Sequence, residues 1–187
     1  MQIPTITAYH KSDFRKWLKK NHKKYSKAAV IIHKKHTGKN SPTHRELIDE
    51  AICFGWIDTT IKRLDEDTFV RYFSKRTNNS RWSDNTLSYG KHLIKEGKMS
   101  EQGLHYYKLG LAKPTHDHGI SKDPPMPEEL KEALVKNKKA GESFEKFSPS
   151  IKRAVYRWIL RGKQAATKEK RVNRTVENAL KNSKSVY

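Results

Sequence analysis

Apolar side chains in the first part of the chain recur with two different spacings. Residues 12–20 show the i, i+3, i+4 spacing of a helix face, and Ser12 is placed to cap that helix. The apolar positions of this face are Phe14, Trp17 and Leu18. Lysine-rich residues 21–27 end the helix, and the apolar, β-branched run 28–32 predicts a buried strand.

The middle of the chain combines a helix signal with two strand signals. Thr43 and Glu46 have the three-residue spacing of a capping box, in which each side chain bonds the other's free backbone N–H. An apolar face follows at Leu47, Ile48, Ala51 and Ile52. Residues 56–64 and 68–75 alternate like strands around an acidic turn, which predicts a hairpin. We therefore expect an α+β fold with a small antiparallel sheet built from residues 28–32, 56–64 and 68–75.

Downstream of the hairpin, every periodic segment predicts a helix. Ser83 and Ser100 begin two of them, and another starts at Pro127. Two more helices cover residues 148–161 and 167–180, with Ser148 as a predicted cap. The stretch 113–127, with four prolines, is the only linker-like segment. We predict an α+β core at residues 1–112, a proline-rich linker at 113–127 and a C-terminal helical section at 128–187, packed on the core as one domain.

The excess of positive charge is concentrated near the two ends of the chain. The net charge is +20, of which residues 1–40 hold +10 and residues 151–187 hold +9. Such a surface attracts nucleic acid, anionic lipid or acidic partners, or else only keeps the protein in solution. The candidate anion or nucleic-acid surface comprises Arg153, Arg157, Arg161, Lys168, Arg171 and Arg174.

Cysteine usage and hydropathy indicate a cytoplasmic protein. The longest apolar run, residues 28–32, is far shorter than the roughly 20 residues of a spanning helix, so we expect no membrane insertion. The residues after Met1 lack the pattern of a secretory signal. Cys53 is the single cysteine and fits a reducing compartment. It lies in an apolar stretch, which favours a packed thiol over a nucleophile.

The central, nearly neutral segment holds a set of polar residues that could bind a ligand. Gly55 allows a tight bend at the mouth of a strand, and a carboxylate follows it closely. The candidate ligand-binding residues are Asp58, Arg71, Arg76, Ser80, Trp82 and Asn85. The alternative is structural, with Asp58 and Arg76 forming an ion pair or cap and Trp82 filling the core.

Signatures of known chemistry are not found. The sequence has no dinucleotide, nucleotide-triphosphate, zinc-protease or serine-hydrolase motif. His116 and His118 form an HxH, but a metal site needs three or four converging ligands. We therefore assign no catalytic residue, metal or cofactor, and enzymatic activity stays an open question that the sequence disfavours.

Three blocks of the sequence carry a family resemblance. The first is residues 50–58, and the second comprises Lys75-Arg76, residues 80–85, Gly97-Lys98-Met99 and Gly103-Leu104. The third is the pair of helices at residues 150–162 and 167–176. On these blocks the chain resembles the bacteriocin-protection family, also described as YdeI or OmpD-associated. The resemblance implies a protein without an established reaction, linked in some members to the envelope and to peptide resistance.

Two hypotheses of function follow. One is a non-catalytic cytoplasmic binding or stress-protection protein that uses the Asp58 neighbourhood for a small polar ligand or a protein partner. The other is sequence-nonspecific nucleic-acid binding through the basic terminal helices, with the steep salt dependence of phosphate contacts. An acidic protein, a small polar ligand and nucleic acid are the partner classes these surfaces allow.

Overall fold

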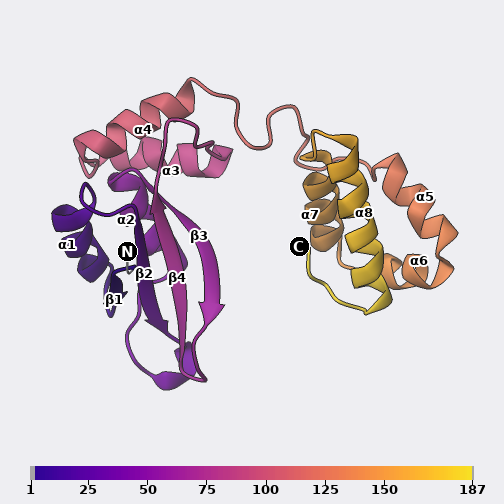
Figure 1. Cartoon of the computed structure of the whole chain (residues 1–187), viewed down its shortest axis with the longest axis horizontal. Coiled ribbons are helices and arrows are strands. Elements are labelled where there is room, and N and C mark those ends of the chain that lie inside the picture. Colours follow the sequence, from indigo (N-terminus) through magenta and orange to yellow (C-terminus); the bar gives the residue numbers. More distant parts are fainter. Residues whose placement is uncertain (1–2, 187) are drawn as a thin grey trace. The chain divides into compact units, whose positions relative to one another are not determined.

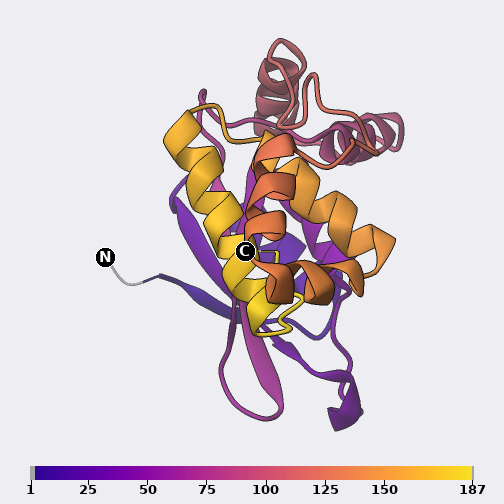
Figure 2. The ribbon, with the colours of Figure 1, turned by 90° about the vertical axis from the view of Figure 1, so that its right-hand side faces the viewer.

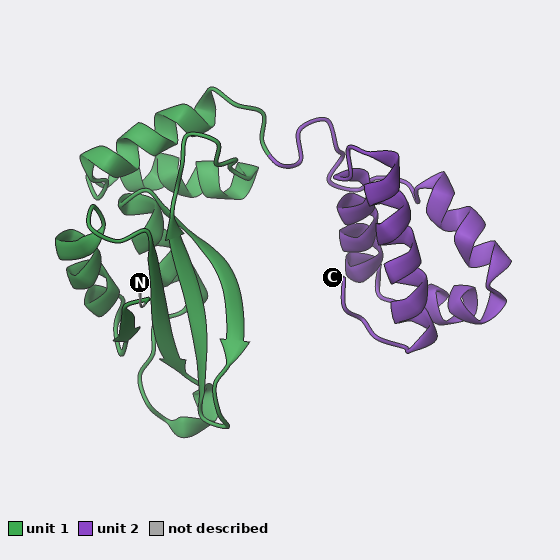
Figure 3. Ribbon diagram, in the orientation of Figure 1, with its two compact units in different colours: residues 1–115 green, residues 116–187 purple. Residues whose placement is uncertain are grey.

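The protein forms two compact units, seen in a computed structural model that describes residues 3–186 (Figure 3). Unit 1 ends at Thr115 and unit 2 begins at His116, inside the predicted linker. Each unit has its own cluster of buried apolar side chains. That the C-terminal section packs on the core as one domain stays a prediction.

Unit 1 holds all the strands in the described part of the chain and four α-helices (Figure 1). In chain order its elements are β1 (Thr5–Thr7), α1 (Lys11–Asn21), β2 (Lys27–His33), the 3-10 turn η1 (Lys35–Thr37), α2 (His44–Cys53), β3 (Trp56–Arg63), β4 (Thr68–Lys75), α3 (Asp84–Lys95) and α4 (Glu101–Leu111). The predicted hairpin, the strand over 28–32 and the four helices are confirmed.

The sheet has the strand order β1-β2-β4-β3. β4 pairs antiparallel with both β2 and β3, whereas β1 runs parallel to β2. The α+β class is therefore confirmed, and the three predicted strands pair antiparallel as expected, while β1 adds a parallel strand at the edge of the sheet. β1 was not predicted because a three-residue strand is too short to show an alternating pattern. A register shift between Asp58 and Ile61 marks an irregularity in β3.

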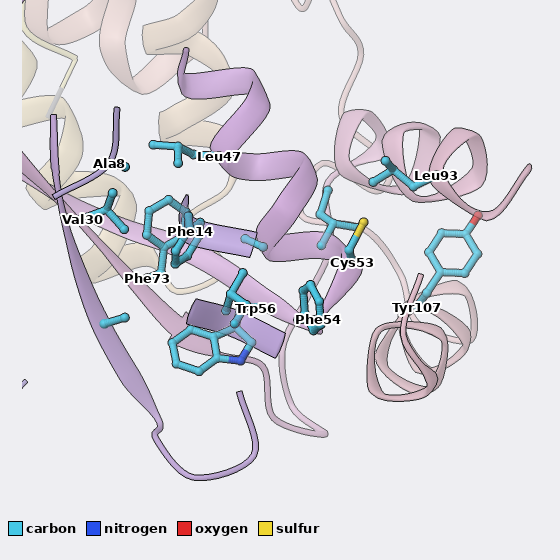
Figure 4. Close-up of a cluster of buried hydrophobic side chains, with 14 of the residues drawn as sticks. Ala8, Phe14, Val30, Leu47, Cys53, Phe54, Trp56, Phe73, Leu93 and Tyr107 are labelled. Carbon is cyan, nitrogen blue, oxygen red and sulfur yellow. The ribbon is translucent and has the colours of Figure 1, made fainter. Parts of the chain in front are cut away.

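The core of unit 1 lies between the helices and one face of the sheet (Figure 4). Phe14 of α1 meets Phe73 of β4 with ring centroids 4.7 Å apart. Other fully buried anchors come from the strands and from α2, and they include Val30, Leu47 and Trp56. Because these residues recur at the spacing predicted for each element, the amphipathic pattern accounts for this packing.

The predicted N-terminal cap is correct for α2 and wrong for α1. The Thr43 hydroxyl accepts from Glu46 N, and Glu46 Oε2 accepts from Thr43 N, which confirms the capping box. Ser12, however, lies inside α1. The cap residue is His10, because Asp13 Oδ2 accepts from the backbone N–H of His10 at 2.9 Å.

Unit 2 is entirely helical in its described part, and Figure 2 shows its helices packed on one another. Its elements are α5 (Glu128–Lys136), α6 (Lys138–Glu145), α7 (Pro149–Leu160) and α8 (Ala165–Leu180). Phe144 and Ile159 are fully buried at its centre. α6 was not predicted, and Ser148 occupies the N-cap position of α7, where its hydroxyl lies 3.0 Å from that of Ser150 and makes no capping hydrogen bond. No helix in the described part of the chain is both long and apolar enough to cross a membrane.

Candidate functional site

Asp58 forms a small cross-strand cluster near the start of α2. Its Oδ2 accepts a hydrogen bond from Arg71 Nη1 at 3.3 Å and lies 3.1 Å from Nε2 of His44. Arg71 is well buried, whereas the His44 side chain is half exposed. An ion pair between Asp58 and an arginine of the partner strand therefore exists, but in the described part of the chain it forms with Arg71 and not with Arg76. Both contacts of Asp58 involve Oδ2 and its side chain is 30% exposed, so the carboxylate is engaged with Arg71 and His44 through one of its two oxygens.

Arg76 is enclosed at the end of β4. Its guanidinium carbon lies 3.6 Å from the ring centroid of Trp82, and Nη1 donates to the carbonyl of Arg81 at 3.2 Å. Only 1% of Arg76 is exposed, and its Nε has no hydrogen-bond partner. Burial lowers the pKa of Arg76 to about 10, while the charge of Asp58 acts in the opposite direction. The side chain thus stays charged at neutral pH, but it is covered.

The six predicted ligand-binding residues do not converge on one pocket. Ser80 closes a turn by accepting from Thr77 N through its hydroxyl at 2.9 Å. Asn85 is exposed in the first turn of α3. Trp82 is buried against Gly110, where an added Cβ would come within 2.3 Å of the indole. The geometry therefore agrees with the structural alternative for Trp82, which fills the core, whereas Arg76 is buried against Trp82 and forms no ion pair with Asp58 among the described residues.

The predicted anion surface of unit 2 carries acidic partners along α7. Arg157 and Arg161 both bond the carboxylate of Asp117, with Arg161 Nε 2.5 Å from Oδ1. The guanidinium of Arg161 is the main cause that lowers the pKa of Asp117. Arg153 lies 3.9 Å from Asp123. All three arginines of this helix are thus close to carboxylates of the preceding segment.

The other three residues of that surface also have neighbours. Lys168 Nζ lies 3.7 Å from Oε1 of Glu129, and Arg174 Nη1 lies 3.3 Å from Oε2 of Glu177. Arg171 donates to the carbonyl of Trp158 and covers its ring. A groove of about 710 Å³ runs along this side of α8, but its walls mix both charge signs. Unit 2 therefore offers no purely basic groove here.

A purely basic groove does exist in unit 1, at the junction of α1, β2 and β4. It has a volume of about 320 Å³, and its charged lining residues are all lysines. These are Lys23, Lys24, Lys27 and Lys75, and we call this site the lysine groove. In the part of the chain that the structure describes, none of the four forms an ion pair, and Lys19 and Lys20 precede them in the chain, in the last turn of α1.

The fold explains why these lysines meet. α1 ends at Asn21, and the chain turns through Tyr25 into β2. β4 ends beside the start of β2, where Lys75 N donates to Ser26 O at 2.9 Å. The sequence analysis identified the basic N-terminal segment, but it did not single out this groove. Lys75 joins the other three only through the pairing of β4 with β2.

Cys53 and its neighbour Glu50 serve structural roles. Burial raises the pKa of the Cys53 thiol to about 11, so it is protonated at neutral pH. Glu50 is buried and accepts from Arg15 Nη1 at 2.6 Å. Among residues 3–186 no group of three or more His, Cys, Asp or Glu side chains could hold a metal ion.

Comparison with known families divides the chain at the same place as the structure. A family model described as a domain of unknown function (DUF8412) matches residues 6–106. The chain belongs to this family. Within the DUF8412 match lie the Asp58 cluster, Arg76 and the lysine groove. A second model, described as Bacteriocin-protection, YdeI or OmpD-Associated, matches residues 123–182 and supports the suspected family.

The two matches also locate the three resemblance blocks. The blocks at residues 50–58 and 75–104 fall in the DUF8412 match, and only the block at residues 150–176 falls in the YdeI or OmpD-associated match. No curated protein and no solved structure matches the chain. The site therefore has to be interpreted from its own chemistry.

Proposed function

We propose that this protein is a non-catalytic, sequence-nonspecific nucleic-acid-binding protein whose phosphate-binding site is the lysine groove. The observation that carries the proposal is the groove's composition, with four lysines and no carboxylate in its lining. Lysine ammonium groups attract phosphates as point charges without requiring a fixed geometry. This fits nonspecific binding, which is dominated by phosphate contacts and by the release of counterions.

The charge of unit 1 supports the same proposal. The unit has 23 basic and 11 acidic residues, and the lysine-rich α1 leads directly into the groove. The basic surface proposed from sequence on unit 2 is less suited as a first contact, since the α7 arginines lie beside Asp117 and Asp123. We therefore move the proposed contact from the C-terminal helices to the N-terminal unit.

Salt-dependent binding of a fluorescent oligonucleotide tests this function. Four phosphate contacts predict that log K falls against log salt with a slope of about −3 to −4. Affinity should drop roughly 50- to 150-fold between about 50 and 200 mM salt. Replacing Lys23, Lys24, Lys27 and Lys75 together with Gln should remove most of this slope.

A matched variant separates the groove from total charge. Lys136, Lys138, Lys139 and Lys146 are exposed lysines of unit 2 without an ion pair to a described residue. Replacing these four with Gln lowers the net charge equally and should leave the slope nearly unchanged. Equal losses in the two quadruple variants would show that only net charge matters, and a wild-type protein without affinity would refute the function.

The match to the bacteriocin-protection family favours a second, physiological proposal. We propose that the chain contributes to stress protection in the cytoplasm by covering nucleic acid. A deletion strain complemented with either quadruple variant tests this role. Only the variant with an intact lysine groove should restore survival under antimicrobial-peptide stress, and equal rescue would separate protection from nucleic-acid binding.

A further inference from the structure

The sheet of unit 1 has a second face that takes no part in the helix-covered core. Side chains alternate along a strand, so the core residues Ala28 and Val30 leave Ala29 and Ile31 on the opposite face. On β4 the same alternation puts Val70 and Tyr72 on that face. None of these four belongs to the core cluster or packs against it. We call this surface the open face.

The centre of the open face is apolar, with an aromatic ring beside it. Tyr72 is paired with Ala29, and Val70 is paired with Ile31. Ala29 and Val70 are buried among their neighbours, whereas Tyr72 is only half-buried. No side-chain hydrogen bond or ring contact is found for Tyr72 among the described residues.

Cations lie on the same face, and the lysine groove adjoins it. Lys27 belongs both to the groove and to the open face, where it is paired with Ser74. Lys62 of β3 is paired with Val70 and adds a second charge. The strand positions of this face include no Asp or Glu. An aromatic pair borders the other end, where Tyr9 stacks on His33 with ring centroids 5.4 Å apart.

From this arrangement we propose that the open face binds single-stranded nucleic acid, with a base stacked on Tyr72 and the backbone following Lys62 and Lys27 into the lysine groove. The inference rests on the proposed function and narrows it to unpaired strands. A sheet face that carries an aromatic ring beside lysines suits bases that are free to stack, because every base has a π-face. The bases of a duplex are already stacked on one another, so a duplex could use only the lysines.

The test compares single-stranded and duplex oligonucleotides of equal length at one salt concentration. Tyr72→Leu keeps an apolar side chain but removes the ring, and it should weaken single-strand binding about tenfold, the effect of losing one stacked base. Duplex binding should change less than about twofold, since its phosphate contacts remain. Tyr72→Phe keeps the ring and should bind both ligands like the wild type, and thermal unfolding verifies that both variants are folded.

The outcomes separate this inference from the function on which it rests. If the lysine-groove variant loses affinity but Tyr72→Leu binds single strands normally, the inference is overturned and the proposed function stands. If no oligonucleotide binds the wild type, both the inference and the proposed function are wrong. If the wild type sediments as a dimer that Tyr72→Leu dissociates, while its single-strand affinity is unchanged, the open face is an interface between two copies and the inference is wrong.

Discussion

At the scale of single residues, Arg76 is a buried cation without a carboxylate within ion-pair distance among the described residues. Its compensation comes from the face of Trp82 and from the carbonyl of Arg81. A ring face and one neutral acceptor replace only part of the water that a guanidinium loses on burial. The lowered pKa of Arg76 expresses this deficit.

We therefore expect Arg76 and Trp82 to contribute very differently to stability. Arg76→Met removes a costly buried charge and keeps an unbranched chain of similar size, so the free energy of unfolding should change by less than about 1.5 kcal/mol. Trp82→Ala leaves a cavity and uncovers the cation, which should cost about 3–5 kcal/mol. Urea unfolding of both variants measures these values.

The pH dependence of unfolding provides the control. The folded state releases the Arg76 proton at lower pH than the unfolded chain, so the unfolded state binds more protons above about pH 10. The free energy of unfolding of the wild type should therefore increase relative to that of Arg76→Met as the pH rises through 10. A constant difference between the two proteins, or a loss of several kcal/mol in Arg76→Met at neutral pH, would contradict this account.

At the scale of elements, the strength of the local pattern decided what the sequence could predict. α7 was predicted because its apolar residues recur without a gap, and α2 because a capping box precedes its apolar face. α6 was missed because its eight residues bury only Ala140 and Phe144 in a polar segment. A four-residue spacing of two side chains is too weak to distinguish a helix from a loop.

In the candidate site, only contacts between residues of one hairpin could be predicted from the sequence. Asp58 and Arg71 lie on adjacent strands, so their pairing could be anticipated from the hairpin. Arg76 and Trp82 meet through an irregular segment whose path no periodic pattern specifies. The lysine groove needs the pairing of β2 with β4, which are separated by α2 and β3 in the chain. Such long-range pairing is a tertiary property that one sequence does not display locally.

The segment before α5 is held to α7 by Asp117, and this contact predicts an effect on stability. Asp117→Asn removes the charge that bonds Arg157 and Arg161, which should lower the free energy of unfolding of unit 2 by about 1–3 kcal/mol. The pKa of Asp117 is lowered in the folded state, so this stabilisation is present near neutral pH and is lost as the pH falls below the ordinary aspartate range. Thermal unfolding at neutral and acidic pH measures it.

Asp123 offers a matched control on the same segment. Its carboxylate is 77% exposed and lies 3.9 Å from Arg153, so Asp123→Asn should change stability by less than about 1 kcal/mol. Protease cleavage within residues 116–123 should accelerate in Asp117→Asn and not in Asp123→Asn. Similar cleavage rates in the two variants would mean that Asp117 does not hold the segment.

At the scale of the whole molecule, the chain combines two cores with two basic segments. Residues 1–40 belong to unit 1 and residues 151–187 to unit 2, so the two halves of the charge excess lie in different compact units. Each unit closes its own apolar cluster, and the two families match different units. The lysine groove proposed to bind nucleic acid is therefore lined by residues of unit 1 alone.

Core variants test whether the two units unfold separately. Leu47 and Phe144 are fully buried, one in each core, and truncation to Ala should cost about 2–5 kcal/mol in the unit that contains it. In calorimetry, Leu47→Ala should lower one transition temperature and Phe144→Ala only the other. A loss of 3 kcal/mol in the smaller unit 2 corresponds to a shift of more than about 10 °C, which calorimetry resolves easily. If either variant shifts both transitions together, the units unfold as one domain, and the prediction that the C-terminal section packs on the core gains support.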